Sequence, residues 1–121
     1  MNKFGFFDEQ SEDESLVLLK QLQAEGPLHN EEQVLSYLAG GTQVMAIGGI
    51  TTDLLSEDDD VIGSPHVFSD GTWCWTSDVV HYVETHHIAL PLAFLMHMER
   101  NHWQCPAVSD PKAIVEQVWQ A

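Results

Sequence analysis

Basic residues are scarce in this sequence. Only four of the 121 residues are Lys or Arg, whereas 19 are Asp or Glu, so the formal net charge is −15. A surface of this charge repels phosphate backbones, which excludes direct binding to DNA or RNA through a basic face. It attracts basic proteins and metal cations instead. Acidity of this kind also increases solubility, so the charge alone is equally compatible with a protein that merely stays dissolved.

Long apolar runs and cysteines are scarce as well. No run approaches the ~20 apolar residues that span a bilayer, and the opening MNKFGFFDEQ lacks the features of a signal peptide. The two cysteines, Cys74 and Cys105, could pair, but two cysteines without a secretory signal are typical of reduced thiols in a cytosolic protein. We therefore expect a cytoplasmic protein that does not associate with a membrane.

Catalytic motifs are also missing. The chain contains no phosphate-binding loop, no dinucleotide fingerprint and no G-x-S-x-G elbow. No cation neighbours Cys74 in the sequence to lower the pKa of its thiol, and Asp70 and Asp78 are explained by a turn and a helix start. We therefore expect no enzymatic activity, no catalytic residue and no cofactor.

The apolar content predicts a folded protein. Hydrophobic residues make up 44% of the chain and include four Trp and five Phe, which is more than a disordered chain carries. The length is near the commonest size of one domain, and no linker, internal repeat or low-complexity segment divides the sequence. We predict one domain over residues 1–121.

The run VFSDGTWCWTSDVV, which begins at residue 67, predicts a hairpin that leads into a helix. Two β-prone segments flank Asp70-Gly71, a dipeptide that suits a tight primed turn. Alternation along the second segment places Trp73 and Trp75 on one face and Cys74 on the other. The helix that follows carries an apolar stripe, and we expect it to fold back onto the two tryptophans.

Start and stop signals mark the other helices. Ser11 and Glu14 match a capping box, and Gly26-Pro27 is expected to end that helix. Asn30 is the predicted cap of a second helix, which Gly40-Gly41 stops.

Two further helices are predicted near the end of the sequence. Pro91 suits the first position of one of them, and Asp110 caps the other with Pro111 at its first position.

Short β-prone runs between these helices complete the predicted fold. Strands are expected at residues 42–47, 50–52 and 61–62, and Phe4, Phe6 and Phe7 are expected to pack on the core. The sequence thus predicts an α+β fold, in which a small antiparallel sheet with a central hairpin is packed by about four to five helices.

The window DLLSEDDD is the most acidic short stretch of the chain, and mutual repulsion predicts a solvated loop there. Its consecutive acids lack the glycine and the alternating ligands of an EF-hand, so no calcium site is predicted. The acids are Asp53, Glu57, Asp58, Asp59 and Asp60.

Five of the seven histidines lie close together in the sequence, but without the spacing of an HExxH zinc site. We therefore assign no metal ligand. A small metal-dependent hydrolase or metal-binding protein remains the alternative function. Its ligands would come from His81, His86, His87, His97, His102, Cys74 and Cys105.

The run SDGTWCWTSDVVHYVETHHIALPLAFLMHM resembles immunity proteins of contact-dependent growth inhibition and related polymorphic toxin systems of bacteria. The shared pattern is DG-x-W-x-W before a helix with paired aromatics, then Leu-Pro and a helix that contains Phe. The resemblance extends over residues 34–106 and departs from the pattern at Thr76, where Pro is expected, and at His81, where an aromatic is commoner. It implies a stoichiometric inhibitor of the C-terminal domain of a secreted toxin.

The acidity fits this implication independently. A toxin that attacks nucleic acid presents a basic cleft, which a polyanionic partner can occupy and approach faster by electrostatic steering. We therefore expect an immunity protein, monomeric when free, that neutralises a basic toxin domain; an acidic adaptor domain remains a second alternative. The expected contacts are Asp53, Glu57, Asp58, Asp59 and Asp60, with a second patch of Asp8, Glu9, Glu12, Asp13 and Glu14.

Overall fold

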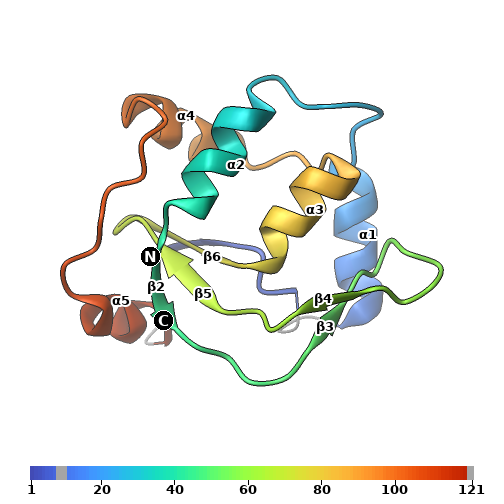
Figure 1. The fold of residues 1–121 in the computed structure, drawn as a ribbon, viewed down its shortest axis with the longest axis horizontal. Helices are drawn as coiled ribbons and strands as arrows, with labels where there is room; N and C mark the ends of the chain where they lie inside the picture. The colour runs from blue at the N-terminus through green and yellow to red at the C-terminus, as the bar shows by residue number, and fades with distance from the viewer. Residues whose placement is uncertain (8–10, 120–121) are drawn as a thin grey trace.

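The computed structural model describes residues 1–7 and 11–119 and confirms the α+β class (Figure 1). The helices are α1 (Glu12–Leu22), α2 (Glu31–Ala39), α3 (Asp78–His86), α4 (Leu92–Arg100) and α5 (Pro111–Trp119). The strands are β1 (Asn2–Phe4), β2 (Thr42–Met45), β3 (Thr51–Thr52), β4 (Val61–Gly63), β5 (Val67–Ser69) and β6 (Trp73–Thr76). No helix in these described ranges is both long enough and apolar enough to cross a bilayer.

The main sheet is mixed, which corrects the prediction of a purely antiparallel sheet. Its strand order is β1-β6-β5-β2, and β5 pairs antiparallel with both of its neighbours. The strand β1, however, runs parallel to β6, with Phe4 opposite Trp75. Parallel strands need a long connection, so no local turn signal announces such a pair. The strands β3 and β4 form a separate two-stranded antiparallel ribbon.

The β5–β6 hairpin forms where the sequence predicts it, but its turn lies one residue later. The backbone N–H of Asp70 donates to the carbonyl oxygen of Trp73 at 3.2 Å, which leaves Gly71 and Thr72 as the central pair. Gly71 has a φ of 96°, a value that glycine adopts without strain. Asp70 contributes through its side chain, which accepts hydrogen bonds from the backbone N–H groups of Thr72 and Trp73.

The two faces of β6 belong to two separate parts of the core, as the alternation predicts. Trp73 and Trp75 are buried against side chains of α2, α3 and α4, and Trp73 stacks on Phe94 of α4 at 4.5 Å between ring centroids. Cys74 faces the other way and packs with Ile114 and Val118 of α5. Figure 1 accordingly shows α2 and α3 on one side of the sheet and α5 on the other. The hairpin is therefore the scaffold of the molecule.

The helix α1 ends at Leu22, earlier than the predicted stop at Gly26-Pro27. The residue that follows, Gln23, is extended and pairs with Ile88 of the segment after α3. The Leu22 carbonyl oxygen accepts from the N–H of Ala89, and the N–H of Ala24 donates to the carbonyl oxygen of His87. The segment after α3 thus provides hydrogen-bond partners for backbone groups at the end of α1, so the helix ends there without a glycine.

The predicted helix caps are partly right. Ser11 Oγ accepts from the backbone N–H of Glu14 at 3.2 Å, and Asp110 Oδ1 accepts from the N–H of Ala113 at 3.3 Å. Asn30 precedes α2 in a left-handed conformation and makes no side-chain cap. Pro91 lies one position earlier than predicted, because α4 begins at Leu92.

The helix α2 ends at Gly40-Gly41 as predicted, and Gly41 has a packing role that the sequence does not reveal. Gly40 has a φ of −82°, so it is not the left-handed glycine that commonly ends a helix. A Cβ on Gly41 would lie 2.5 Å from Cζ2 of Trp75, whose side chain is fully buried. Gly41 is therefore required by the close approach of the chain to the indole.

Replacing Gly41 by Ala is expected to lower the free energy of unfolding by about 1–3 kcal/mol, because the added methyl overpacks the core at Trp75. Chemical denaturation of the wild type and the variant measures this loss. Gly48→Ala is the matched control, since a Cβ added at Gly48 would meet no atom within 4 Å and the same substitution there should be neutral or slightly stabilising. Equal stability of the two variants would contradict the packing argument.

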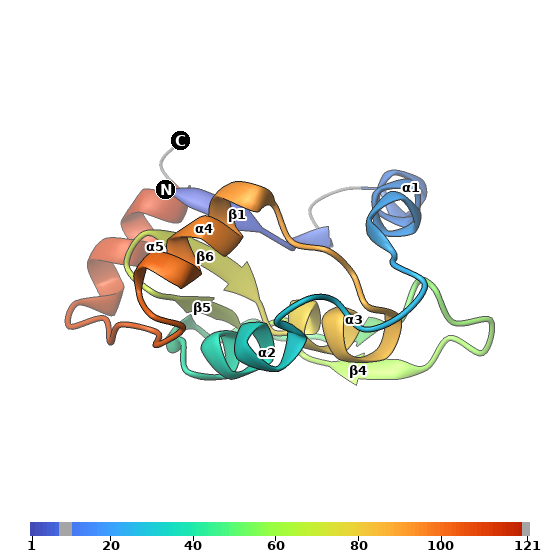
Figure 2. The same cartoon turned by 90° about the horizontal axis from the view of Figure 1, so that it is seen from above.

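The β3–β4 ribbon and α1 lie together at one end of the molecule (Figures 1 and 2). A hollow of about 360 Å³ separates them, and its lining includes Glu12 of α1 and Thr51 and Thr52 of β3. The ribbon also contacts α3, which carries several of the histidines. Acidic and histidine-rich segments that are distant in the sequence are thus brought to the same end.

Candidate functional site

The acidic loop joins β3 to β4 and is ordered by its own hydrogen bonds. The N–H of Asp53 donates to the carbonyl oxygen of Asp60 at 2.7 Å, and Ser56 Oγ donates to Asp60 Oδ2 at 2.7 Å. The N–H of Asp58 donates to Ser56 Oγ at 3.2 Å. Asp59 has a left-handed φ of 50°, which Asp tolerates better than most residues. The side chains of Glu57, Asp58, Asp59 and Asp60 are exposed, as the sequence predicts for a solvated loop.

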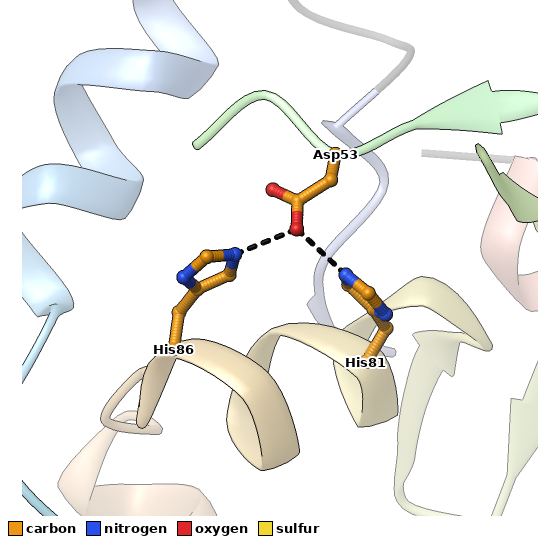
Figure 3. A group of neighbouring side chains, drawn as sticks. All are labelled: Asp53, His81 and His86. Atoms are coloured by element: carbon orange, nitrogen blue, oxygen red, sulfur yellow. Dashed lines mark hydrogen bonds and ion pairs between the residues drawn. The ribbon is translucent and has the colours of Figure 1, made fainter. Parts of the chain in front are cut away.

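Asp53 differs from the other acids of this loop because it is buried, with only 2% of its surface exposed. Its Oδ2 lies 2.7 Å from Nε2 of His81 and 2.6 Å from Nε2 of His86, both on α3 (Figure 3). Its Oδ1 accepts from the backbone N–H of Leu55 at 2.9 Å. The prediction that Asp53 lies in a solvated loop is therefore wrong: it anchors the loop to α3 and is not part of its exposed surface.

The pKa of Asp53 reflects this environment. Burial opposes ionisation of the carboxyl group, but hydrogen bonds from His81, His86 and the Leu55 N–H outweigh it. The pKa of Asp53 consequently lies below its ordinary value, and the side chain is a carboxylate at neutral pH.

The second acidic patch lies in the first turn of α1. Glu12, Asp13 and Glu14 are exposed there, next to the positive end of the helix dipole, where carboxylates are favourable. Asp8 and Glu9, which the sequence places in the same patch, lie outside the described residues.

Exposed apolar side chains accompany the acids at this end of the molecule. Ile50, just before β3, is 70% exposed, and Val61 of β4 is 66% exposed. Val17 of α1 is also exposed and lines a shallow hollow together with Asp13 and Glu14. Apolar side chains surrounded by charged ones are the usual composition of a surface that binds another protein.

Neutralising cations are sparse around this surface. The sequence contains no Lys or Arg between Lys20 and Arg100, a stretch that includes the whole β3–β4 ribbon and α3. The exposed acids therefore produce a field of one sign that extends into solvent over roughly 10 Å at moderate salt.

A second buried carboxylate, Asp70, is held by a network that spans three parts of the fold. Its Oδ2 accepts from the hydroxyl of Tyr37 on α2 at 2.5 Å and lies 3.1 Å from Nε2 of His97 on α4. Burial, together with the Asp70 carboxylate, raises the pKa of Tyr37 above its ordinary value, so the phenol remains a donor. Asp70 Oδ1 also accepts hydrogen bonds from two backbone N–H groups of the turn. Both carboxylate oxygens therefore have hydrogen-bond partners, and we assign this network a structural role.

The remaining candidate metal ligands of the sequence are separated in space. His87 Nδ1 lies 2.7 Å from Glu31 Oε1, and His102 is exposed. Cys74 and Cys105 are free thiols, and Cys74 is fully buried beneath α5. Within the described ranges, the group of three or more side chains suited to a metal ion consists of Asp53, His81 and His86, without a cysteine.

Sequence reasoning named all three of these residues but did not group them. His81 and His86 are five positions apart, which does not match the i, i+4 spacing of HExxH. Both imidazoles can still reach the same carboxylate, because His86 is the last residue of α3 and Asp53 approaches from a different element (Figure 3). The five-residue spacing of the two histidines at a helix end is a local signal, but nothing in the sequence shows that Asp53 lies opposite them.

Comparisons of this chain with protein families, with curated proteins and with solved structures give no significant match.

Proposed function

We propose that this chain is an immunity protein, a stoichiometric inhibitor that binds a basic toxin domain through its acidic end. The observation that carries the proposal is that the two acidic patches, from α1 and from the β3–β4 loop, lie at the same end of the molecule (Figures 1 and 2). The contact residues that we propose are Glu57, Asp58, Asp59, Asp60, Glu12, Asp13 and Glu14.

The exposed apolar residues support a protein partner in particular. Ile50 directly precedes the ribbon that carries the acidic loop and Val61 is part of it, so we expect a partner that engages the carboxylates also to cover apolar surface. Charge gives rapid and selective association, whereas burial of apolar side chains at the centre of an interface gives most of the affinity.

A nuclease is the toxin class that fits this surface best. An enzyme that cleaves nucleic acid needs a cationic cleft for the phosphate backbone. The acidic end would occupy such a cleft and exclude the substrate, and inhibition would take place in the cytoplasm of the cell that makes the toxin. No catalytic step by the inhibitor is required.

The first test is whether the gene directly upstream of the gene for this chain encodes a protein with a basic C-terminal domain; that domain is then the partner in the binding experiment. We expect the two proteins to bind at equimolar ratio and toxin activity to be lost on binding. The dissociation constant, measured by calorimetry between about 50 and about 500 mM NaCl, should rise steeply with salt, because this range reduces the screening length from above ~10 Å to a few Å.

Charge-reversal variants locate the contact. Glu57→Lys with Asp58→Lys is expected to weaken binding at least about tenfold at low salt and to reduce the salt dependence. Asp59 and Asp60 are left unchanged, because Asp59 has a left-handed φ and Asp60 accepts from Ser56.

The matched control reverses two exposed acids elsewhere, Glu99 on α4 and Glu116 on α5. It makes the same change in net charge and should have little effect on affinity. An affinity of the wild type that does not change with salt would refute the electrostatic role of the acidic end.

A further inference from the structure

The cluster of Asp53, His81 and His86 has a geometry that the proposed toxin contact does not use. One potential ligand atom from each of the three residues lies within 4.8 Å of the other two. Figure 3 shows both imidazole rings leaning from α3 toward the same carboxylate oxygen. The acids of the proposed contact surface are other residues of the same loop and of α1.

The ligand set suits a divalent transition metal. Imidazole and carboxylate together favour Zn²⁺ and its neighbours, whereas Ca²⁺ and Mg²⁺ prefer sites made only of oxygen. Tetrahedral Zn²⁺ with bonds of about 2.0–2.1 Å holds its ligand atoms about 3.4 Å apart. The distances from Asp53 Oδ2 to the two nitrogens are 2.7 Å and 2.6 Å, so each nitrogen needs to move away by less than about 1 Å to admit the ion.

The surroundings hold the three ligands in place. Oδ1 of Asp53 accepts from the N–H of Leu55, which orients the carboxylate and directs Oδ2 toward the histidines. His86 is followed by His87, which lies against Glu31 at 2.7 Å, and by Ile88, which pairs with Gln23. The end of α3 is thereby fixed to α2 and to the segment after α1.

The site is also accessible from solvent. The side chains of His81 and His86 are 28% and 17% exposed, whereas Asp53 is 2% exposed. Three protein ligands with one open side match the arrangement of zinc sites whose fourth ligand is water. The net charge of −15 further raises the local concentration of cations.

We propose that Asp53, His81 and His86 bind one Zn²⁺ ion. The ion replaces two imidazole N–H donors as the partner of the carboxylate: each ring coordinates through a deprotonated Nε2 and carries its one proton on Nδ1, and the second proton of any imidazolium is released to solvent. The acidic loop is thereby linked to α3 by coordination bonds. Because the N–H of Asp53 closes the loop onto Asp60, binding at Asp53 also stiffens the segment that carries Glu57 and Asp58.

The first measurement uses untagged protein that has been treated with a chelator and dialysed. Titration with Zn²⁺ by calorimetry is expected to give one ion per chain. At a free Zn²⁺ concentration about 100 times the dissociation constant, the midpoint of thermal unfolding should rise by roughly 10 °C. Nitrogen NMR of the wild type should show that Nε2 of His81 and His86, and not of the other histidines, shifts on addition of Zn²⁺.

Two variants separate coordination from hydrogen bonding. His81→Gln and His86→Gln keep an N–H donor for Asp53 but remove the imidazole ligand, so we expect Zn²⁺ affinity to fall about 100-fold in each. His29→Gln and His102→Gln change exposed histidines outside the cluster and should bind Zn²⁺ as the wild type does. Toxin is absent from these experiments, so their outcome does not depend on the proposed toxin inhibition.

The proposal is wrong if the wild type shows no saturable binding, or if the two cluster variants bind Zn²⁺ as tightly as it does. It is equally wrong if NMR places the shifted nitrogens on other histidines. The wild-type NMR result stands even where a cluster variant fails to fold.

Discussion

Replacement of Asp70 by Ala is expected to lower the free energy of unfolding by about 3–4 kcal/mol, a large share of the 5–15 kcal/mol typical of a domain. The carboxylate accepts from Thr72 N–H at 2.8 Å, Trp73 N–H at 2.7 Å and Tyr37 hydroxyl at 2.5 Å, and lies 3.1 Å from His97. Its side chain is fully buried, so alanine leaves several donors without an acceptor and without water.

Urea denaturation measures the loss, and two variants serve as controls. Asp70→Asn retains an acceptor for the turn but not the carboxylate opposite Tyr37, so about half of the effect should remain. Asp110→Ala removes an exposed capping carboxylate with the same change in charge and should cost about 1 kcal/mol or less. If Asp70→Ala and Asp110→Ala destabilised the protein equally, the buried network would have no special role.

Alkylation of Cys105 is expected to be on the order of 10²-fold slower than that of an unperturbed thiol near pH 8. Burial, with a smaller contribution from the Asp70 carboxylate, raises the pKa of Cys105 to about 12, compared with an ordinary value of about 8.5. Near pH 8 the fraction of Cys105 present as thiolate is therefore about 10³-fold or more below that of an ordinary thiol. The greater intrinsic nucleophilicity of a thiolate with a high pKa recovers part of that loss.

The pH dependence of the rate is the sharper measurement. Because the thiol ionises only near pH 12, the rate of iodoacetamide addition at Cys105 should still be rising at about pH 10.5, where an ordinary thiol has reached its plateau. Peptide mass spectrometry distinguishes Cys105 from Cys74, whose thiol is fully buried and should not react in the native protein. Unfolded protein supplies the reference rate for both. A plateau below about pH 9.5 would contradict the raised pKa.

Local signals account for most of the secondary structure. The helix cap at Ser11, the Asp110-Pro111 start of α5 and the alternation of Trp73, Cys74 and Trp75 are all found in the structure as predicted. Each involves residues a few positions apart, where side-chain and backbone groups meet whatever the tertiary fold.

The errors arise where distant segments decide the local structure. The end of α1 depends on Ile88, and the need for glycine at position 41 depends on Trp75. Asp53 illustrates the same limit at the candidate site: its neighbours in the sequence are solvated acids, but two histidines from α3 enclose it. A one-dimensional pattern of charge cannot show which member of an acidic run is turned inward.

The parallel pairing of β1 with β6 places a constraint on biosynthesis. Phe6 donates its backbone N–H to Thr76 Oγ1, 70 residues later in the chain, and Phe4 lies opposite Trp75. At translation rates of about 5–20 residues per second, roughly 4–14 s pass between the synthesis of Phe6 and that of Thr76. Throughout this interval the aromatic residues of the amino-terminal segment have no sheet to join. The nascent chain must therefore remain soluble with these aromatics uncovered, a period in which its large negative charge opposes self-association.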